Sequence, residues 1–113
     1  MKLVIVESPY AGNVKRNELY ARRAMADCLA RGEAPFASHL LYTQPGVLDD
    51  LKPDERALGI QAGLAWGDAA DVTVVYVDYD MSRGMLKGLE RADRAKRPVE
   101  IRTIGINPGD FHV

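Results

Sequence analysis

Two carboxylates separated by one residue follow a continuous apolar run in the middle of the chain. Val72 to Val77 is β-branched and aromatic, and Asp78 and Asp80 come directly after it. Such a run predicts a strand buried on both faces of a parallel sheet. Residues that end such a strand lie at the carboxyl edge, where α/β proteins bind ligands. There the two carboxylates could hold ligand hydroxyls and transfer protons, and turn formation with helix capping is the alternative.

A second group of polar residues comes between this strand and a predicted helix. Ser82-Arg83-Gly84 precedes apolar residues at helical spacing, namely Met85, Leu86, Leu89, Ala92 and Ala95. Free amides at a helix N-terminus, with Arg83 as counter-charge, could bind a phosphate or a carboxylate. The alternative is a plain capped turn. We include Met85, the first apolar residue of the helix, among the predicted ligand contacts.

The first predicted strand, Leu3 to Val6, also ends in a loop with ligand-binding potential. Ser8 supplies a hydroxyl, Tyr10 an aromatic ring and Gly12 flexibility, and Asn13 can cap the following helix. These are the parts of an anion-binding loop, although the spaced glycines of a dinucleotide fingerprint and a Walker lysine are missing. In a parallel sheet this loop would face the same crevice as the residues after Val77.

The remaining elements complete a strand–helix alternation. We expect a helix from Asn13 to about Arg31 that ends at Gly32, and a strand from Ala34 to Leu41. This strand carries His39, which could act as a base or hydrogen-bond donor or be structural. A long polar connection, Tyr42 to Asp54, follows.

Asp54 is expected to cap a helix from Glu55 to Gly67, and a last strand is expected from Val99 to Ile104. The helix would direct Leu58, Ala62, Ala65 and Trp66 towards the core. The alternation of strands and helices predicts one α/β domain over residues 1–113 with a mainly parallel sheet of four to five strands. No structure is predicted for the tail that begins at Gly105.

Composition restricts the classes of function. The formal net charge of −1 argues against binding a nucleic-acid backbone. One cysteine excludes an intrachain disulfide, and two distant histidines give no support for a metal site. The N-terminal apolar run is too short for a signal peptide or a membrane span. We therefore expect a cytoplasmic protein that uses neither membrane nor cofactor.

Several segments, taken together, resemble one family. They are S-P-Y-A-G-N, A-P-F-A-S-H-L-L-Y-T, A-D-V-T-V-V-Y-V-D, S-R-G-M-x-x-G-L-E-x-A and R-P-V-E-I-R. Their order and spacing resemble a small bacterial and phage branch of the nucleoside 2-deoxyribosyltransferase-like group, which includes deoxynucleoside monophosphate N-glycosidases. The resemblance covers the chain up to Ile104. It implies a flavodoxin-like, Rossmann-like three-layer fold that binds a nucleoside or nucleotide and assembles into homo-oligomers.

The resemblance also implies roles for particular residues. The loop that helps to hold the ligand matches Ser8, Tyr10 and Gly12, and the substrate-contacting aspartate matches Asp78 or Asp80. The nucleophilic glutamate of the family, however, falls on Gly88 in this chain. The nearest carboxylate, Glu90, is two residues further on, a rotation of about 200° around a helix.

Three functions are therefore compared. The first is a nucleoside- or nucleotide-binding enzyme that acts on the N-glycosidic bond, with Asp78, Asp80 and Glu90 as catalytic candidates. The second is a non-catalytic module that senses a nucleotide-derived ligand. The third is a small oligomeric interaction protein that uses the segment from Tyr42 to Asp54 and the C-terminal tail for subunit contacts.

Overall fold

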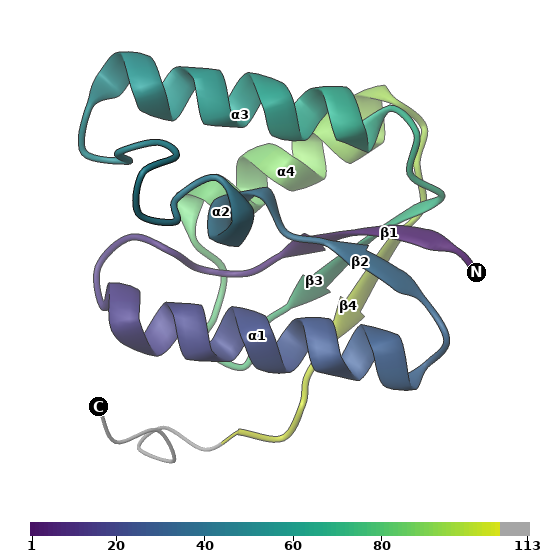
Figure 1. The fold of residues 1–113 in the computed structure, drawn as a ribbon. Coiled ribbons are helices and arrows are strands. Elements are labelled where there is room, and N and C mark those ends of the chain that lie inside the picture. The colour runs from purple at the N-terminus through teal and green to yellow at the C-terminus, as the bar shows by residue number, and fades with distance from the viewer. Residues whose placement is uncertain (107–113) are drawn as a thin grey trace.

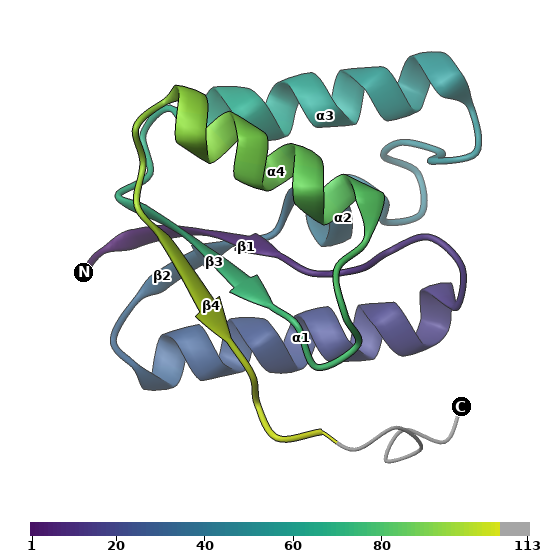
Figure 2. The same cartoon turned by 180° about the vertical axis from the view of Figure 1, so that it is seen from behind.

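A four-stranded parallel sheet lies between two layers of helices in the computed structural model, which describes residues 1–106 (Figures 1 and 2). Helix α1 covers one face, and α2, α3 and α4 cover the other. The strands are β1 (Leu3–Glu7), β2 (Ala34–Phe36), β3 (Val72–Tyr76) and β4 (Val99–Arg102). The helices are α1 (Val14–Ala30), α2 (Ser38–Leu41), α3 (Pro53–Gly67) and α4 (Arg83–Arg94).

The strand order is β2-β1-β3-β4, and every neighbouring pair is parallel. Val6 lies opposite Val74, and Tyr76 lies opposite Arg102. In this order the chain changes direction across the sheet between β1 and β3, and open α/β sheets are expected to bind ligands at the carboxyl ends of such strands. The predicted flavodoxin-like, three-layer α/β fold is confirmed.

Alternate residues of each strand point to opposite faces of the sheet. Val4 and Val6 of β1 belong to the buried core on the α1 face. The other core residues on that face include Val74, Tyr76, Tyr20, Ala24 and Cys28. By the same alternation Ile5 and Glu7 of β1, and Val75 of β3, face the layer that contains α4. Glu7 is the last residue of β1, so the strand delivers a carboxyl group into that layer.

The predicted helix boundaries are confirmed at three places. Asn13 caps α1 by accepting a hydrogen bond from the Arg16 amide. Gly32 follows the end of α1 with φ of +78°, a left-handed conformation that favours glycine. Ser82 caps α4 and accepts a hydrogen bond from the Met85 amide, which is the capped turn given above as the alternative to anion binding.

The strand predicted from Ala34 to Leu41 is wrong in its second half. It ends at Phe36, and Ser38–Leu41 forms the short helix α2. The Tyr42 amide donates to the Ser38 carbonyl at 3.0 Å, and the Thr43 hydroxyl donates to the His39 carbonyl at 2.7 Å. These local bonds satisfy backbone groups that an edge strand such as β2 would leave unpaired.

Helix α3 begins earlier than predicted, and its orientation towards the core is wrong. It starts at Pro53, with Lys52 rather than Asp54 in the capping position. Proline is favoured at the first position of a helix because the amide hydrogen that it lacks would have no partner there. Leu58 and Trp66 are 55% and 59% exposed. The helix lies in an outer position against α2, so most of its apolar side chains do not reach the sheet (Figure 1).

At the C-terminal end, β4 stops at Arg102 rather than at Ile104. The amides of Ile104, Gly105 and Ile106 turn to Asp78 instead of extending the ladder. Subunit contacts were also predicted for the C-terminal tail, and from position 107 onward that tail lies outside the described residues. None of the helices within residues 1–106 is both long and apolar enough to cross a membrane.

Candidate functional site

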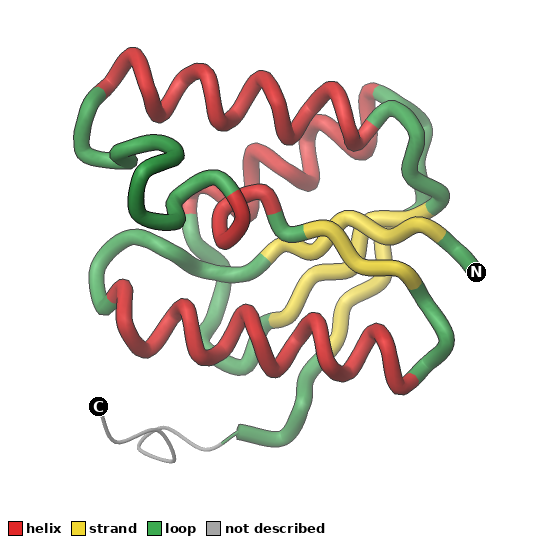
Figure 3. Tube along the Cα trace, in the orientation of Figure 1, coloured by secondary structure: helices red, strands yellow, loops and turns green. Residues whose placement is uncertain are grey.

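The loops that follow β1 and β3 and the segment after α2 gather on one side of the sheet (Figure 3). The β1–α1 loop is shaped by Asn17, which was not among the predicted site residues. Asn17 is 1% exposed and donates to the carbonyls of Tyr10 and Ala11 at 2.8 and 3.2 Å. Gly12 has φ of +96°, so a glycine is favoured at this turn. The buried amide of Asn17 therefore determines where Tyr10 stands.

Ser8 and His39, both predicted ligand contacts, lie against each other. The Ser8 hydroxyl and His39 Nε2 are 2.7 Å apart, and Ser8 is buried. Burial lowers the pKa of His39 to about 4, so its ring is neutral at pH 7. The pair joins the β1–α1 loop to α2, and the neutral ring can exchange hydrogen bonds but carries no charge.

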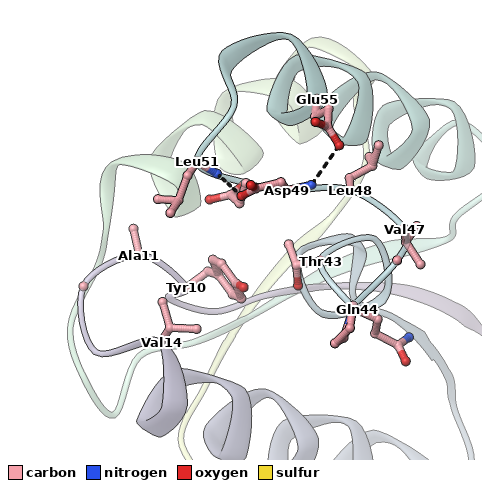
Figure 4. A pocket seen from close by; sticks show the side chains of 14 residues that line it. Tyr10, Ala11, Val14, Thr43, Gln44, Val47, Leu48, Asp49, Leu51 and Glu55 are labelled. Atoms are coloured by element: carbon pink, nitrogen blue, oxygen red, sulfur yellow. Dashed lines mark hydrogen bonds between the residues drawn. The ribbon is translucent and has the colours of Figure 1, made fainter.

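An open pocket of about 720 Å³ lies between the β1–α1 loop and the segment that follows α2 (Figure 4). Tyr10, Ala11 and Val14 form one wall, and the opposite wall includes Thr43 and Leu51. The second wall is held by hydrogen bonds from the Asp49 amide to Glu55 and from the Leu51 amide to Asp49. The pocket therefore joins a predicted ligand loop to the long connection whose role the sequence left open.

The residues at the start of α4 have separate positions. Ser82 is the capping residue, and Met85 is 1% exposed, so its side chain packs in the protein interior. The Met85 sulfur also accepts from the Ser82 amide at 3.4 Å. Arg83 and Gly84 are exposed at the first turn. The predicted anion-binding role of this turn therefore depends on Arg83 and on backbone amides, because the hydroxyl of Ser82 is used by the cap.

Asp78 lies on the α1 side of the sheet edge. Its carboxylate accepts hydrogen bonds from the Tyr20 hydroxyl at 2.5 Å and from the amides of residues 104–106 at 3.0 to 3.1 Å. Burial opposes ionisation, but these hydrogen bonds outweigh it and hold the pKa of Asp78 below its usual value. The carboxylate is therefore ionised, and its acceptor positions are largely occupied by the protein itself.

The other two carboxylates named as catalytic candidates are on the surface. Asp80 is exposed and has φ of +67°, and its amide donates to the Val77 carbonyl, which closes a turn. Glu90 is exposed on α4. Asp78, Asp80 and Glu90 are thus not gathered around one cavity, and their catalytic role stays a prediction.

Glu7 was not among the predicted site residues, because its position was expected to lie in the loop after the first strand. The structure places Glu7 at the end of β1, partly exposed and facing α4. Burial raises the pKa of Glu7 to about 7, and the positive charge of Arg97 opposes this shift. Within residues 1–106 its carboxylate forms neither a hydrogen bond nor a salt bridge. The alternation Leu3, Ile5, Glu7 was the signal that could have shown which layer it faces.

We expect the Glu7→Gln variant to lose part of the pH dependence of stability. Folding favours the protonated form of Glu7. Its stabilising contribution to the free energy of unfolding is therefore complete below pH 4.5 and is lost as the pH rises to about 7. Because solvent reaches this carboxylate, the effect should be on the order of 1 to 2 kcal/mol.

Urea unfolding at pH 5 and pH 8 measures this effect. Wild type should lose more stability between the two values than Glu7→Gln does. Glu90→Gln, at an exposed position on α4, is the matched control and should follow wild type. Equal losses in wild type and Glu7→Gln would contradict the raised pKa.

No group of three or more potential metal ligands among histidine, cysteine, aspartate and glutamate occurs within residues 1–106. The neighbourhood of Glu7, Ser8 and Tyr10 instead combines one carboxyl group that lacks a hydrogen-bonding partner, a neutral serine–histidine pair and an aromatic ring beside a pocket. This combination suits an uncharged or anionic organic ligand better than a metal ion.

Residues 2–102 match the model of a family described as Domain of unknown function (DUF7768). The chain belongs to this family. The matched range extends from β1 to the last residue of β4, so membership in DUF7768 concerns the entire sheet and all four helices.

The fold is also that of a solved structure, a 2-deoxyribosyltransferase from the psychrotolerant bacterium Bacillus psychrosaccharolyticus. The two chains are 18% identical and superpose with a TM-score of 0.63 over 98% of this chain and 76% of the other. The similarity confirms the expected fold relationship of this DUF7768 member. No curated protein matches the chain.

Proposed function

We propose that this DUF7768 protein binds a nucleoside or nucleotide at the carboxyl edge of β1 and β3 and acts on its N-glycosidic bond. The observation that carries the proposal is the pocket of about 720 Å³ beside the β1–α1 loop. Its volume falls in the range of small-molecule sites, and one of its walls is the loop that leaves the carboxyl end of β1. The fold shared with a 2-deoxyribosyltransferase supports a nucleoside rather than another small molecule.

In this proposal Tyr10, which lines the pocket, and three residues outside its lining have distinct tasks. Tyr10, which extends between the two walls in Figure 4, stacks on the base. The first turn of α4, with Arg83, binds a phosphate when the ligand carries one. Ser8 and His39 provide neutral hydrogen-bonding groups near the sugar.

The test is a chromatographic assay for free base on ribo- and deoxynucleosides and their 5′-monophosphates, with thermal unfolding recorded on the same samples. We expect base release from at least one compound. We also expect a rise in Tm of several degrees at saturating ligand, because selective binding stabilises the native state by about 2.7 kcal/mol at 100 times Kd. Tyr10→Ala should lose this rise, whereas Leu29→Ala, on the exposed surface of α1, should keep it.

The remaining outcomes separate the alternatives. A rise in Tm without base release would favour the ligand-sensing module. Neither release nor stabilisation across the panel would contradict nucleoside binding and favour an assembly protein. A specific observation supports assembly as the second candidate: Leu58, Ile60 and Trp66 leave apolar surface exposed on α3, at 55%, 50% and 59%. Homo-oligomers of this chain would cover such a surface.

A further inference from the structure

Glu7 and Gly88 come from different elements and meet at one point in space. A β-carbon added at Gly88 would lie 2.7 Å from Oε1 of Glu7 and closer still to its Cδ and Oε2. Carbon atoms of real side chains do not approach other groups so closely. The volume that a side chain at position 88 would need is therefore already filled by the Glu7 carboxyl group.

The surroundings of this carboxyl group are those of a reactive group rather than of a structural one. Within the described residues it forms no hydrogen bond and no salt bridge, although it is only partly exposed. Arg97, the cation that influences it, is bound elsewhere, with Nε donating to the Thr73 hydroxyl and Nη1 to the Gly67 carbonyl. A carboxyl group held near a helix without a partner costs folding free energy, which is typical of functional sites.

We infer that Glu7 is the catalytic carboxylate of the proposed site and that Gly88 is the positioning residue that leaves room for it. This inference rests on the proposed function. The sequence places a glycine where the resemblance expects a carboxylate on the helix, and the structure shows a carboxylate at that place from β1. The chain thus supplies the group from the end of a strand instead of from a helix.

The chemistry assigned to Glu7 is displacement at the anomeric carbon of the sugar. An ionised Glu7 oxygen forms a bond to C1′, and the bond from C1′ to the base nitrogen breaks, with its electron pair leaving on the base. The base takes a proton from water. Water then attacks C1′ of the glycosyl ester, its hydroxyl stays on the sugar, its proton goes to solvent, and the Glu7 carboxylate is regenerated.

The test compares base release by variants on the nucleoside or nucleotide that wild type cleaves. Glu7→Gln should lower kcat by about 10³-fold or more, because an essential group is removed while the shape is kept. Asp93→Asn removes an exposed carboxylate from α4, the helix that carries Gly88, and should leave kcat within twofold of wild type. A Glu7→Gln variant that keeps more than a tenth of wild-type kcat would overturn the inference while leaving the proposed function intact.

Gly88→Ala tests the positioning role. The added methyl group should displace the flexible Glu7 carboxyl group and lower kcat about 10²-fold with little change in KM, because misplacing a reacting group by about 1 Å has this effect. Gly67→Ala is the matched control, since its β-carbon would be at an ordinary 3.6 Å from Arg97. Equal kcat values for the two glycine variants would overturn the role of Gly88.

A double variant completes the test. Glu7→Ala with Gly88→Glu returns a carboxylate to the same place from the helix, and we expect at least tenfold recovery of kcat over Glu7→Ala alone. Circular dichroism on every variant confirms folding before rates are compared. A folded double variant without recovery would overturn the claim that both positions reach one place. Absence of base release by wild type on the entire panel would instead contradict the proposed function itself, and this inference with it.

Discussion

Arg102→Ala is expected to lower the free energy of unfolding by about 3 to 5 kcal/mol, because it breaks a buried ion pair by removing one partner. The Arg102 side chain is 3% exposed. Its two Nη atoms donate to the two carboxylate oxygens of Glu33, both at 2.7 Å, and it also contacts Glu100 and the Tyr76 hydroxyl. The variant would leave a Glu33 carboxylate that is 14% exposed without its cation.

The loss would extend through the sheet. Tyr76 lies opposite Arg102 in the register of β3 and β4, and its hydroxyl donates to Asp27 of α1 at 2.7 Å. Arg102 therefore ties the edge strand β4 to α1 through two side chains. Since β4 leads directly into the residues that bind Asp78, the variant should also loosen the sheet edge near the crevice.

Urea unfolding at pH 7, followed by circular dichroism, measures this prediction. Arg31→Ala is the matched control, because its side chain is 43% exposed and its ion pair with Asp27 is on the surface. Exposed pairs contribute at most about 1 kcal/mol. Similar losses of unfolding free energy in the two variants would show that burial does not determine how much the Arg102–Glu33 ion pair contributes to stability.

Asp78→Asn is expected to lower the free energy of unfolding at pH 7 by about 2 to 3 kcal/mol, the usual effect of losing hydrogen bonds to a charged group. Both carboxylate oxygens of Asp78 accept from backbone amides of residues 104–106, and one also accepts from Tyr20. An asparagine amide would present N–H groups to those donors. The segment after β4 would then lose its attachment to the sheet edge.

The effect should depend on pH in a defined direction. The pKa of Asp78 is lowered in the folded state, so the stabilisation is present above the unfolded-state pKa of about 4 and lost as the pH falls through the folded-state value. The difference between wild type and Asp78→Asn should therefore shrink in acid, because protonated aspartate resembles asparagine.

Asp80→Asn is the control for this series. Asp80 is exposed with a left-handed backbone, a conformation that asparagine also adopts, so the change should stay within about 0.5 kcal/mol. Thermal unfolding of the three proteins from pH 3 to pH 7 is the measurement. A difference between wild type and Asp78→Asn that is constant over this range would contradict the assignment of the stabilisation to the charged carboxylate.

The two faces of the sheet edge carry carboxylates with different hydrogen bonding. Asp78 lies on the α1 face, where its acceptors hold the chain after β4, whereas Glu7 faces α4 without a hydrogen-bonding partner among the described residues. A carboxylate saturated by backbone amides is kept ionised but is poorly placed to share its charge with a ligand. In the proposed function the carboxylate without such bonds is therefore assigned the chemistry.

The sequence by itself determined the fold class and most element positions of this DUF7768 protein. Apolar runs such as Val72 to Tyr76 and helical spacing such as that after Arg83 are local signals, and capping by Asn13 and Ser82 depends on neighbours within three residues. These features were predicted because the interactions that enforce them lie within a single element or at its ends.

Local sequence signals predicted the wrong structure where packing against another element determines the conformation or the burial of a segment. Helix α2 replaced part of a strand at the edge of the sheet, and the apolar residues Leu58 and Trp66 of α3 remained exposed because that helix lies in an outer position. Apolar spacing shows that a helix has an apolar face, but not whether the sheet has room to bury it.

Only the tertiary structure decided the candidate site. The meeting of Glu7 with Gly88, the saturation of Asp78 by Tyr20 and the backbone of residues 104–106, and the pocket between the β1–α1 loop and the segment after α2 all join distant parts of the chain. Spacing along a sequence assigns a residue to an element and a face. The packing of those faces determines which residues become neighbours. It therefore also determines that Asp78 is hydrogen-bonded and that Glu7 has no hydrogen-bonding partner among the described residues.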